Sequence, residues 1–120
     1  MYYGDFSNKS DVCSAFNIDD FDGMVVYASY DIDGYEGSAD VVFVNSGKFF
    51  TVSGSHCSCY GLEDQWGPEE MPVAALQKIA KDGDGHYANA VRSALACVER
   101  LNVDWDNPEM VEIMLKMALS

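Results

Sequence analysis

Three strand-like segments follow one another closely, and their spacing constrains the fold more than any other feature. They span residues 24–30, 39–44 and 48–53, and each is rich in β-branched and aromatic side chains. Asp33-Gly34 has the chemistry of a turn between the first two, and Asn45-Ser46-Gly47 that of a tight hairpin between the last two. Because such short connections join antiparallel neighbours, we expect a three-stranded antiparallel meander.

The residues before these segments are polar and acidic, and they predict one short helix. Ser10 is placed to cap a helix over residues 11–16. Asp11 then lies in the first turn, where a negative charge interacts favourably with the helix dipole.

The C-terminal half predicts two to three helices. Pro68-Glu69-Glu70 is typical of a helix start, and an apolar face continues to Lys81 before the glycines of residues 82–85. Further helices are expected over residues 87–101 and 110–119. We therefore predict a single α+β domain over residues 1–120, with the helices packed on one face of the sheet: residues 1–67 are mainly β with the short N-terminal helix, and residues 68–120 are helical.

The charge of the chain excludes whole classes of partner. Its 120 residues include 20 Asp and Glu against 7 Lys and Arg, which gives a net charge of −13. Phosphate backbones and anionic membranes attract basic surfaces, so we expect neither direct nucleic-acid binding nor membrane binding. The chain shows no signal-peptide pattern and no apolar run of about 18 residues, which predicts a soluble, cytoplasmic protein.

The excess carboxylates gather in a few segments, and these are the candidate partner-binding residues. One group comes from the turns on either side of the first strand, and the other from the segment before and within the last expected helix. The first group is Asp19, Asp20, Asp22, Asp31, Asp33 and Glu36, and the second is Asp104, Asp106, Glu109 and Glu112.

A glycine-flanked segment, Ser55-His56-Cys57-Ser58-Cys59-Tyr60, offers the sharpest local chemistry. His56, Cys57 and Cys59 are three potential zinc ligands, and His86 or Cys97 could supply a fourth. The same thiols could instead act as nucleophiles with His86 as the base. The third interpretation is structural, because reduced cysteines often simply pack inside a protein.

The last expected helix, Met110–Leu119, is apolar on almost every side. Met110, Met114 and Met117 form one stripe, and aliphatic residues cover most of the remainder. A helix of this kind is buried on more than one side. Either it fills the core, or it also forms a homodimer interface.

Part of the sequence resembles a group of small proteins. The box Ser55-His-Cys-Ser-Cys-Tyr-Gly-Leu-Glu63, followed by Gln65-Trp66 and Pro68-Glu69-Glu70, is similar to uncharacterised proteins of bacteriophages and prophages. Residues 28–39 resemble the same proteins, so that the likeness covers about residues 5–80. It implies a phage or prophage origin and carries no known activity.

These observations together favour an inhibitor. An acidic phage-type protein can occupy a basic groove that a host protein uses for nucleic acid, as an inhibitor of a CRISPR effector, a restriction enzyme or a polymerase would. B-DNA carries one charge per roughly 1.7 Å, so ten carboxylates match about 17 Å of duplex. The alternatives are a zinc-binding or cysteine-dependent enzyme centred on the His-Cys-Ser-Cys loop, and an assembly factor without inhibitory activity.

Overall fold

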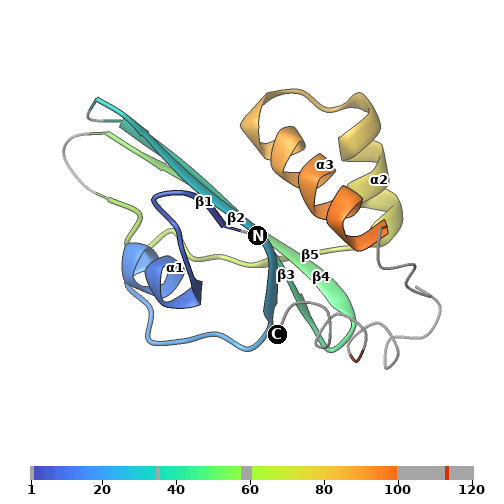
Figure 1. Ribbon diagram of the computed structural model, residues 1–120, viewed down its shortest axis with the longest axis horizontal. Coiled ribbons are helices and arrows are strands. Elements are labelled where there is room, and N and C mark those ends of the chain that lie inside the picture. The colour runs from blue at the N-terminus through green and yellow to red at the C-terminus, as the bar shows by residue number, and fades with distance from the viewer. Residues whose placement is uncertain (1, 35, 58–60, 100–112, 114–120) are drawn as a thin grey trace.

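A computed structural model of the chain describes residues 2–34, 36–57, 61–99 and 113 (Figure 1). The described part is an α+β structure, as the sequence predicts, with a five-stranded sheet and three helices. The order along the chain is β1, α1, β2, β3, β4, β5, α2 and α3.

Three long strands form the centre of the sheet. They are β2 (Met24–Asp33), β3 (Glu36–Asn45) and β4 (Lys48–His56), and each pairs antiparallel with the next. The left-handed residues Ser46 (φ 54°) and Gly47 (φ 76°) close the β3–β4 hairpin. Residues 31–33, 36–38 and 54–56 are also paired, so these strands extend further than their apolar segments indicate.

Two short strands extend the sheet beyond the three strands of the expected antiparallel meander, so the sheet is larger than the sequence predicts. β1 (Tyr2–Gly4) lies parallel to β2, and β5 (Glu69–Met71) lies antiparallel to β4. The sheet is therefore mixed, with the order β1-β2-β3-β4-β5. A strand of three residues is too short to show a periodic pattern in the sequence. It is stabilised by the strand with which it pairs, so local sequence does not predict it.

Helix α1 (Lys9–Phe16) connects β1 to β2, as a parallel pair of strands requires. Its N-cap is Asn8 and not Ser10: the Asn8 side chain accepts a hydrogen bond from the backbone N–H of Asp11 at 2.9 Å. Asn17 ends the helix in a left-handed conformation, and its N–H bonds the carbonyls of Cys13 and Ser14.

Helices α2 (Val73–Asp82) and α3 (Gly85–Glu99) form a hairpin in the C-terminal half. The helix start expected at Pro68 is wrong, because Glu69 and Glu70 belong to β5 and Pro72 is the N-cap of α2. Residues 68–120 therefore contain a strand as well as helices. The α2–α3 turn is held by Arg92, which donates to the carbonyls of Ala80 (2.7 Å) and Gly83 (2.5 Å).

Both faces of the sheet are covered, so the expected packing of helices on one face is wrong. Helices α2 and α3 cover one face, and α1 with the segments 17–23 and 61–67 covers the other (Figure 1). Neighbouring strand residues point to opposite faces, so Val41 joins one core cluster and Val42 the other. A bulge between Val25 and Tyr27 turns both Val26 and Tyr27 toward the helical layer.

The helix expected over Met110–Leu119 lies outside the described residues, apart from Ile113, which is exposed. In the described part of the chain, no helix has the length and apolarity to cross a membrane.

Candidate functional site

The tip of the β2–β3 hairpin carries three of the six carboxylates of the first predicted group. Asp31 and Asp33 end β2, and Glu36 begins β3 directly opposite Asp33. All three side chains are exposed. The tip extends away from the helical layer (Figure 1), so that its carboxylates project from the body of the molecule.

The other three carboxylates of the first predicted group lie in the segment between α1 and β2. Asp19, Asp20 and Asp22 are exposed there, and Lys9 forms an ion pair with Asp20 at 3.5 Å. The Lys9 ammonium also donates to the carbonyls of Phe21 (2.6 Å) and Gly23 (3.2 Å). Lys9 therefore holds the segment in place, and it offsets only part of the local negative charge.

Aromatic packing positions this acidic segment. Phe21 lies between Asp20 and Asp22 in the sequence, and its ring packs on Trp66 (4.7 Å between centroids) and on Phe43 of β3 (4.9 Å). With Phe21 directed inward, the neighbouring carboxylates remain in solvent. The segment is thus anchored to the sheet by one ring.

The same rings position further carboxylates that the sequence reasoning missed. Glu63 lies between buried Leu62 and Trp66, which packs edge-on to Phe16 of α1 at 5.2 Å. Glu63 accepts a hydrogen bond from the N–H of Gly61 at 3.2 Å. Hydrogen bonds from its own N–H and that of Gly61 lower the pKa of the Glu63 carboxyl. The acidic pair Glu63-Asp64 beside a tryptophan was the available sequence signal.

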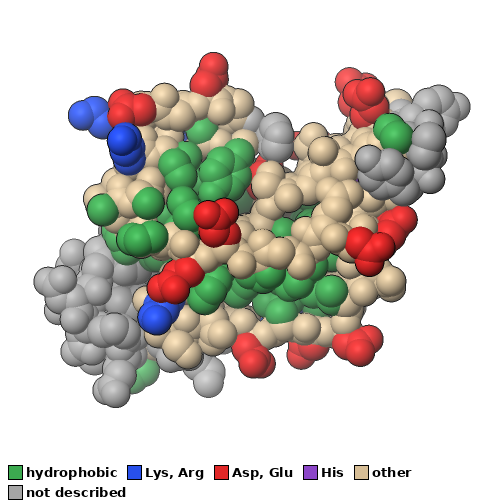
Figure 2. All heavy atoms as spheres, turned by 180° about the vertical axis from the view of Figure 1, so that it is seen from behind, with side chains coloured by type: hydrophobic (Ala, Val, Ile, Leu, Met, Phe, Trp, Pro, Cys, Tyr) green, Lys and Arg blue, Asp and Glu red, His purple; other side chains and the backbone are tan. Residues whose placement is uncertain are grey.

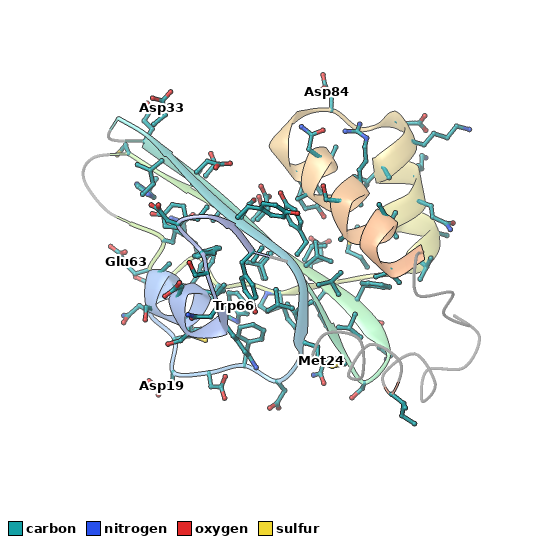
Figure 3. The ribbon with its side chains drawn as sticks, viewed as in Figure 1. Asp19, Met24, Asp33, Glu63, Trp66 and Asp84 are labelled. Atoms are coloured by element: carbon teal, nitrogen blue, oxygen red, sulfur yellow. The ribbon has the colours of Figure 1, made fainter. Side chains whose placement is uncertain are left out.

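Tyr30 shows that carboxylates from distant segments converge here. Burial is the largest cause that raises the pKa of Tyr30, and the negative charges of Asp5 and Glu63 raise it further. The N–H of Asp5 donates to the carbonyl of Tyr30 at 2.9 Å, which fixes Asp5 beside β2. Figure 3 places Asp33, Glu63 and Asp19 along one side of the molecule.

We call this surface the acidic margin. It comprises the six predicted residues of the first group, together with Asp5 and Glu63, which the structure adds. The full set is Asp5, Asp19, Asp20, Asp22, Asp31, Asp33, Glu36 and Glu63.

The described basic residues lie mostly elsewhere. Lys78, Lys81 and Arg92 belong to α2 and α3, and Lys48 begins β4 and pairs with Glu70 at 3.7 Å. Seen from behind in Figure 2, the visible Lys and Arg side chains lie on the left, with acidic side chains beside them, whereas the right and lower edges show acidic side chains and no basic ones among the described residues. Charge is thus distributed unequally between the two ends of the molecule.

The second predicted group, Asp104, Asp106, Glu109 and Glu112, lies outside the described residues.

The His-Cys-Ser-Cys segment begins at the end of β4, where His56 makes two hydrogen bonds. Its Nδ1 lies 3.0 Å from the carbonyl oxygen of Cys57, so Nδ1 carries a proton. In the neutral ring Nε2 then accepts from the hydroxyl of Tyr30 at 2.5 Å. His56 packs over Gly37, where any Cβ would collide with the imidazole.

These contacts support neither the zinc interpretation nor the cysteine-enzyme interpretation of the segment. Cys57 is exposed, Cys59 lies outside the described residues, and nothing is described of the side chains of His86 and Cys97. Within the described ranges, no three His, Cys, Asp or Glu side chains are grouped as metal ligands. Both interpretations remain predictions from the sequence.

One carboxylate lies in the interior of the sheet. Asp40, in the middle of β3, is 2% exposed and accepts a hydrogen bond from the Ser53 hydroxyl at 2.8 Å. Its cross-strand neighbours are Ser29 on β2 and Ser53 on β4, on the face that carries the helical layer. A single Asp within the apolar run Ala39–Val44 was the only sequence signal for this polar row.

Comparisons of the chain with protein-family models, with curated proteins and with solved structures found no significant match.

Proposed function

We propose that this chain is a small acidic binding protein whose acidic margin occupies a basic surface of a nucleic-acid-handling or defence protein. One observation carries the proposal: carboxylates from the α1–β2 segment, the hairpin tip and the 61–67 segment lie along one side of the molecule (Figure 3), and Asp5 lies beside Tyr30 of β2. Among the described basic residues, only Lys9 forms an ion pair with one of them.

The charge distribution supports this function physically. Residues 1–67 contain eleven of the twenty acidic residues and two of the seven basic ones, hence −9 of the total −13. A surface of one sign steers a basic partner toward itself and raises the association rate, and added salt weakens both effects. Basic grooves that bind nucleic acid are arranged for a row of negative charges, which the acidic margin supplies in carboxylate form.

Rigid support of the carboxylates also favours binding. Phe21, Trp66 and the paired strands of the hairpin hold the acidic segments before a partner arrives. Less conformational entropy is then lost on association than with a flexible acidic tail.

The partner class follows from the chemistry and from the resemblance to phage proteins. A host enzyme that cleaves or copies nucleic acid has a basic groove, and a phage gains from blocking it. We infer an inhibitor of such an enzyme, for example a CRISPR effector, acting in the host cytoplasm.

The test compares two triple variants of equal net charge. Asp31→Asn/Asp33→Asn/Glu36→Gln neutralises the hairpin tip, whereas Glu70→Gln/Asp82→Asn/Asp84→Asn neutralises three carboxylates outside the acidic margin. Each immobilised protein is exposed to a bacterial lysate and eluted with rising salt or with duplex DNA. We expect the wild-type protein to retain a nucleic-acid-handling protein that duplex DNA displaces. The tip variant should retain at least about tenfold less, since exposed ion pairs contribute about 0.5–1 kcal/mol each and the variant removes three carboxylates.

The second variant decides whether location or total charge matters. Retention within about twofold of the wild-type value supports the acidic margin, because the partner then distinguishes one surface from another. Equal losses in both variants, or a partner that duplex DNA does not displace, would contradict the proposal.

A further inference from the structure

A hollow of about 310 Å³ lies apart from the acidic margin, at the edge where β4, β5 and the start of α3 meet. Its lining residues are Thr51, Ser53, Gly67, Glu69 and Tyr87. Thr51 and Glu69 are cross-strand partners on β4 and β5, and Tyr87 reaches across from the first turn of α3. The described lining residues therefore come from three elements of regular structure, apart from Gly67, which belongs to a loop.

The directions of two hydrogen bonds determine what this hollow offers to a ligand. The Ser53 hydroxyl donates its one proton to buried Asp40 at 2.8 Å, so the lone pairs of its oxygen remain as acceptors. The Tyr87 hydroxyl donates its proton to Thr51 Oγ1 at 3.0 Å, and its oxygen likewise keeps its acceptor capacity. Glu69 adds a carboxylate, which when ionised only accepts.

The charges around the hollow also favour a ligand that donates hydrogen bonds. Asp40 is 2% exposed and lies directly behind Ser53, and Glu69 lies on the rim. A carboxylate inside the protein acts through a lower effective dielectric than one in water. Tyr87 adds an aromatic ring, whose face attracts cations. Acceptor oxygens, negative charge and a π-face all favour a positively charged ligand that donates N–H hydrogen bonds.

We propose that this hollow, the Ser53–Tyr87 pocket, binds the cationic nitrogen group of an alkylammonium or alkylguanidinium ligand. Glu69 accepts N–H hydrogen bonds from that group, Ser53 and Tyr87 supply further acceptors, and Asp40 keeps the Ser53 hydroxyl turned so that its lone pairs face the ligand. The site uses none of the residues of the acidic margin and is independent of the function proposed for that surface.

The test uses agmatine as the probe, because it carries both an ammonium and a guanidinium group. Binding is measured by calorimetry at about 150 mM salt, where unspecific attraction to an acidic protein is screened. We expect Glu69→Gln and Ser53→Ala each to weaken agmatine binding by about tenfold, the loss of one hydrogen bond to a charged group. Chemical-shift changes on titration should centre on Thr51 and Tyr87.

Glu70→Gln is the matched control. It removes the same charge one residue further along β5, where alternation of side chains directs Glu70 to the other face of the strand and toward Lys48. We expect less than a twofold change in agmatine binding. An equal loss in Glu69→Gln and Glu70→Gln would overturn the proposal, as would agmatine binding that is unchanged in Glu69→Gln.

Two further ligands complete the test. N-pentylurea keeps the N–H donors without the charge, and binding as tight as that of agmatine would overturn the proposal. N-acetyl-arginine amide presents the guanidinium as a protein side chain does. If it binds as tightly as agmatine, the pocket takes an Arg or Lys side chain of a partner. If only agmatine binds, the ligand is a free small amine.

Discussion

The two layers that cover the sheet are built from different side chains. The α2–α3 layer packs Val, Leu and Ala residues such as Leu76, Val91 and Leu95 on the sheet. The opposite layer relies on rings: Phe16 and Phe21 each pack on Trp66, and Phe21 and Trp66 pack on Phe43 of β3. Regular helices bury a continuous stripe of aliphatic residues, whereas irregular segments need a few large side chains that bury much area each.

This difference explains why one side of the molecule can carry so many exposed carboxylates. A loop that is anchored by one ring leaves its other positions free of packing constraints. The segment 19–22 uses Phe21 for packing and three aspartates for the surface, and Leu62 and Trp66 bracket Glu63 and Asp64 in the same way. The helical layer has no such freedom, because several residues per turn face the core.

Truncating one core residue in each layer tests whether the two layers form one folding unit. Phe16 and Leu76 are each 1% exposed. We expect Phe16→Ala to cost about 4 kcal/mol and Leu76→Ala about 3 kcal/mol, from lost burial and the cavities left behind. Urea unfolding followed by circular dichroism measures both. Each variant should unfold in a single transition, because β2, β3 and β4 contribute to both clusters. Two separate transitions in either variant would show that the layers are independent.

Lys9 tests how the acidic side is held together. We expect Lys9→Met to lower stability by about 1–2 kcal/mol, because it removes hydrogen bonds to two carbonyls as well as the pairing with Asp20. The matched control is Lys48→Met at the other end, whose exposed ion pair with Glu70 should contribute less than about 0.5 kcal/mol. Equal losses in chemical denaturation would mean that the carbonyl contacts of Lys9 contribute nothing.

Substitutions at Asn8 and Ser10 test which of the two residues is the N-cap of α1. Asn8→Ala should cost about 1 kcal/mol, because it removes the acceptor for the N–H of Asp11. Ser10→Ala should change stability by less than about 0.3 kcal/mol, since a helical, exposed serine is not a cap. Thermal unfolding of the two variants measures this difference, and a larger effect at Ser10 would restore the sequence-based assignment.

Glu63 gives the smallest expected effect, and its sign depends on pH. Its pKa is lowered in the folded state, so its stabilising contribution is present above the unfolded-state pKa of about 4.3 and is lost as the pH falls through the folded-state pKa. Glu63→Gln should therefore be less stable than the wild type at pH 7, and the difference should shrink toward pH 3. A difference that is the same at both pH values would contradict this account.

Much of the secondary structure was predictable because it is locally encoded. β-branched and aromatic residues predict the central strands, and apolar spacing predicts the start of α3 to within two residues. The failures lie where a local rule competes with long-range pairing. Glu69 and Glu70 have the chemistry of a helix start, yet their backbone pairs with Thr51 and Phe50.

The candidate sites divide in the same way. The exposed carboxylates of residues 19–36 were predictable, because charged residues in turn segments remain in solvent. Their alignment with Asp5 and Glu63 was not, since it depends on which loop packs beside which strand. The Ser53–Tyr87 pocket was not predictable either, because its residues come from β4, β5 and α3.

An α+β chain with a strongly acidic surface follows from composition, charge and local periodicity, because these act within a few residues. The edge strands, the covering of both faces and the grouping of distant carboxylates follow only from long-range packing. Those features depend on hydrogen bonds and ring contacts between residues far apart in the chain, which no local pattern records.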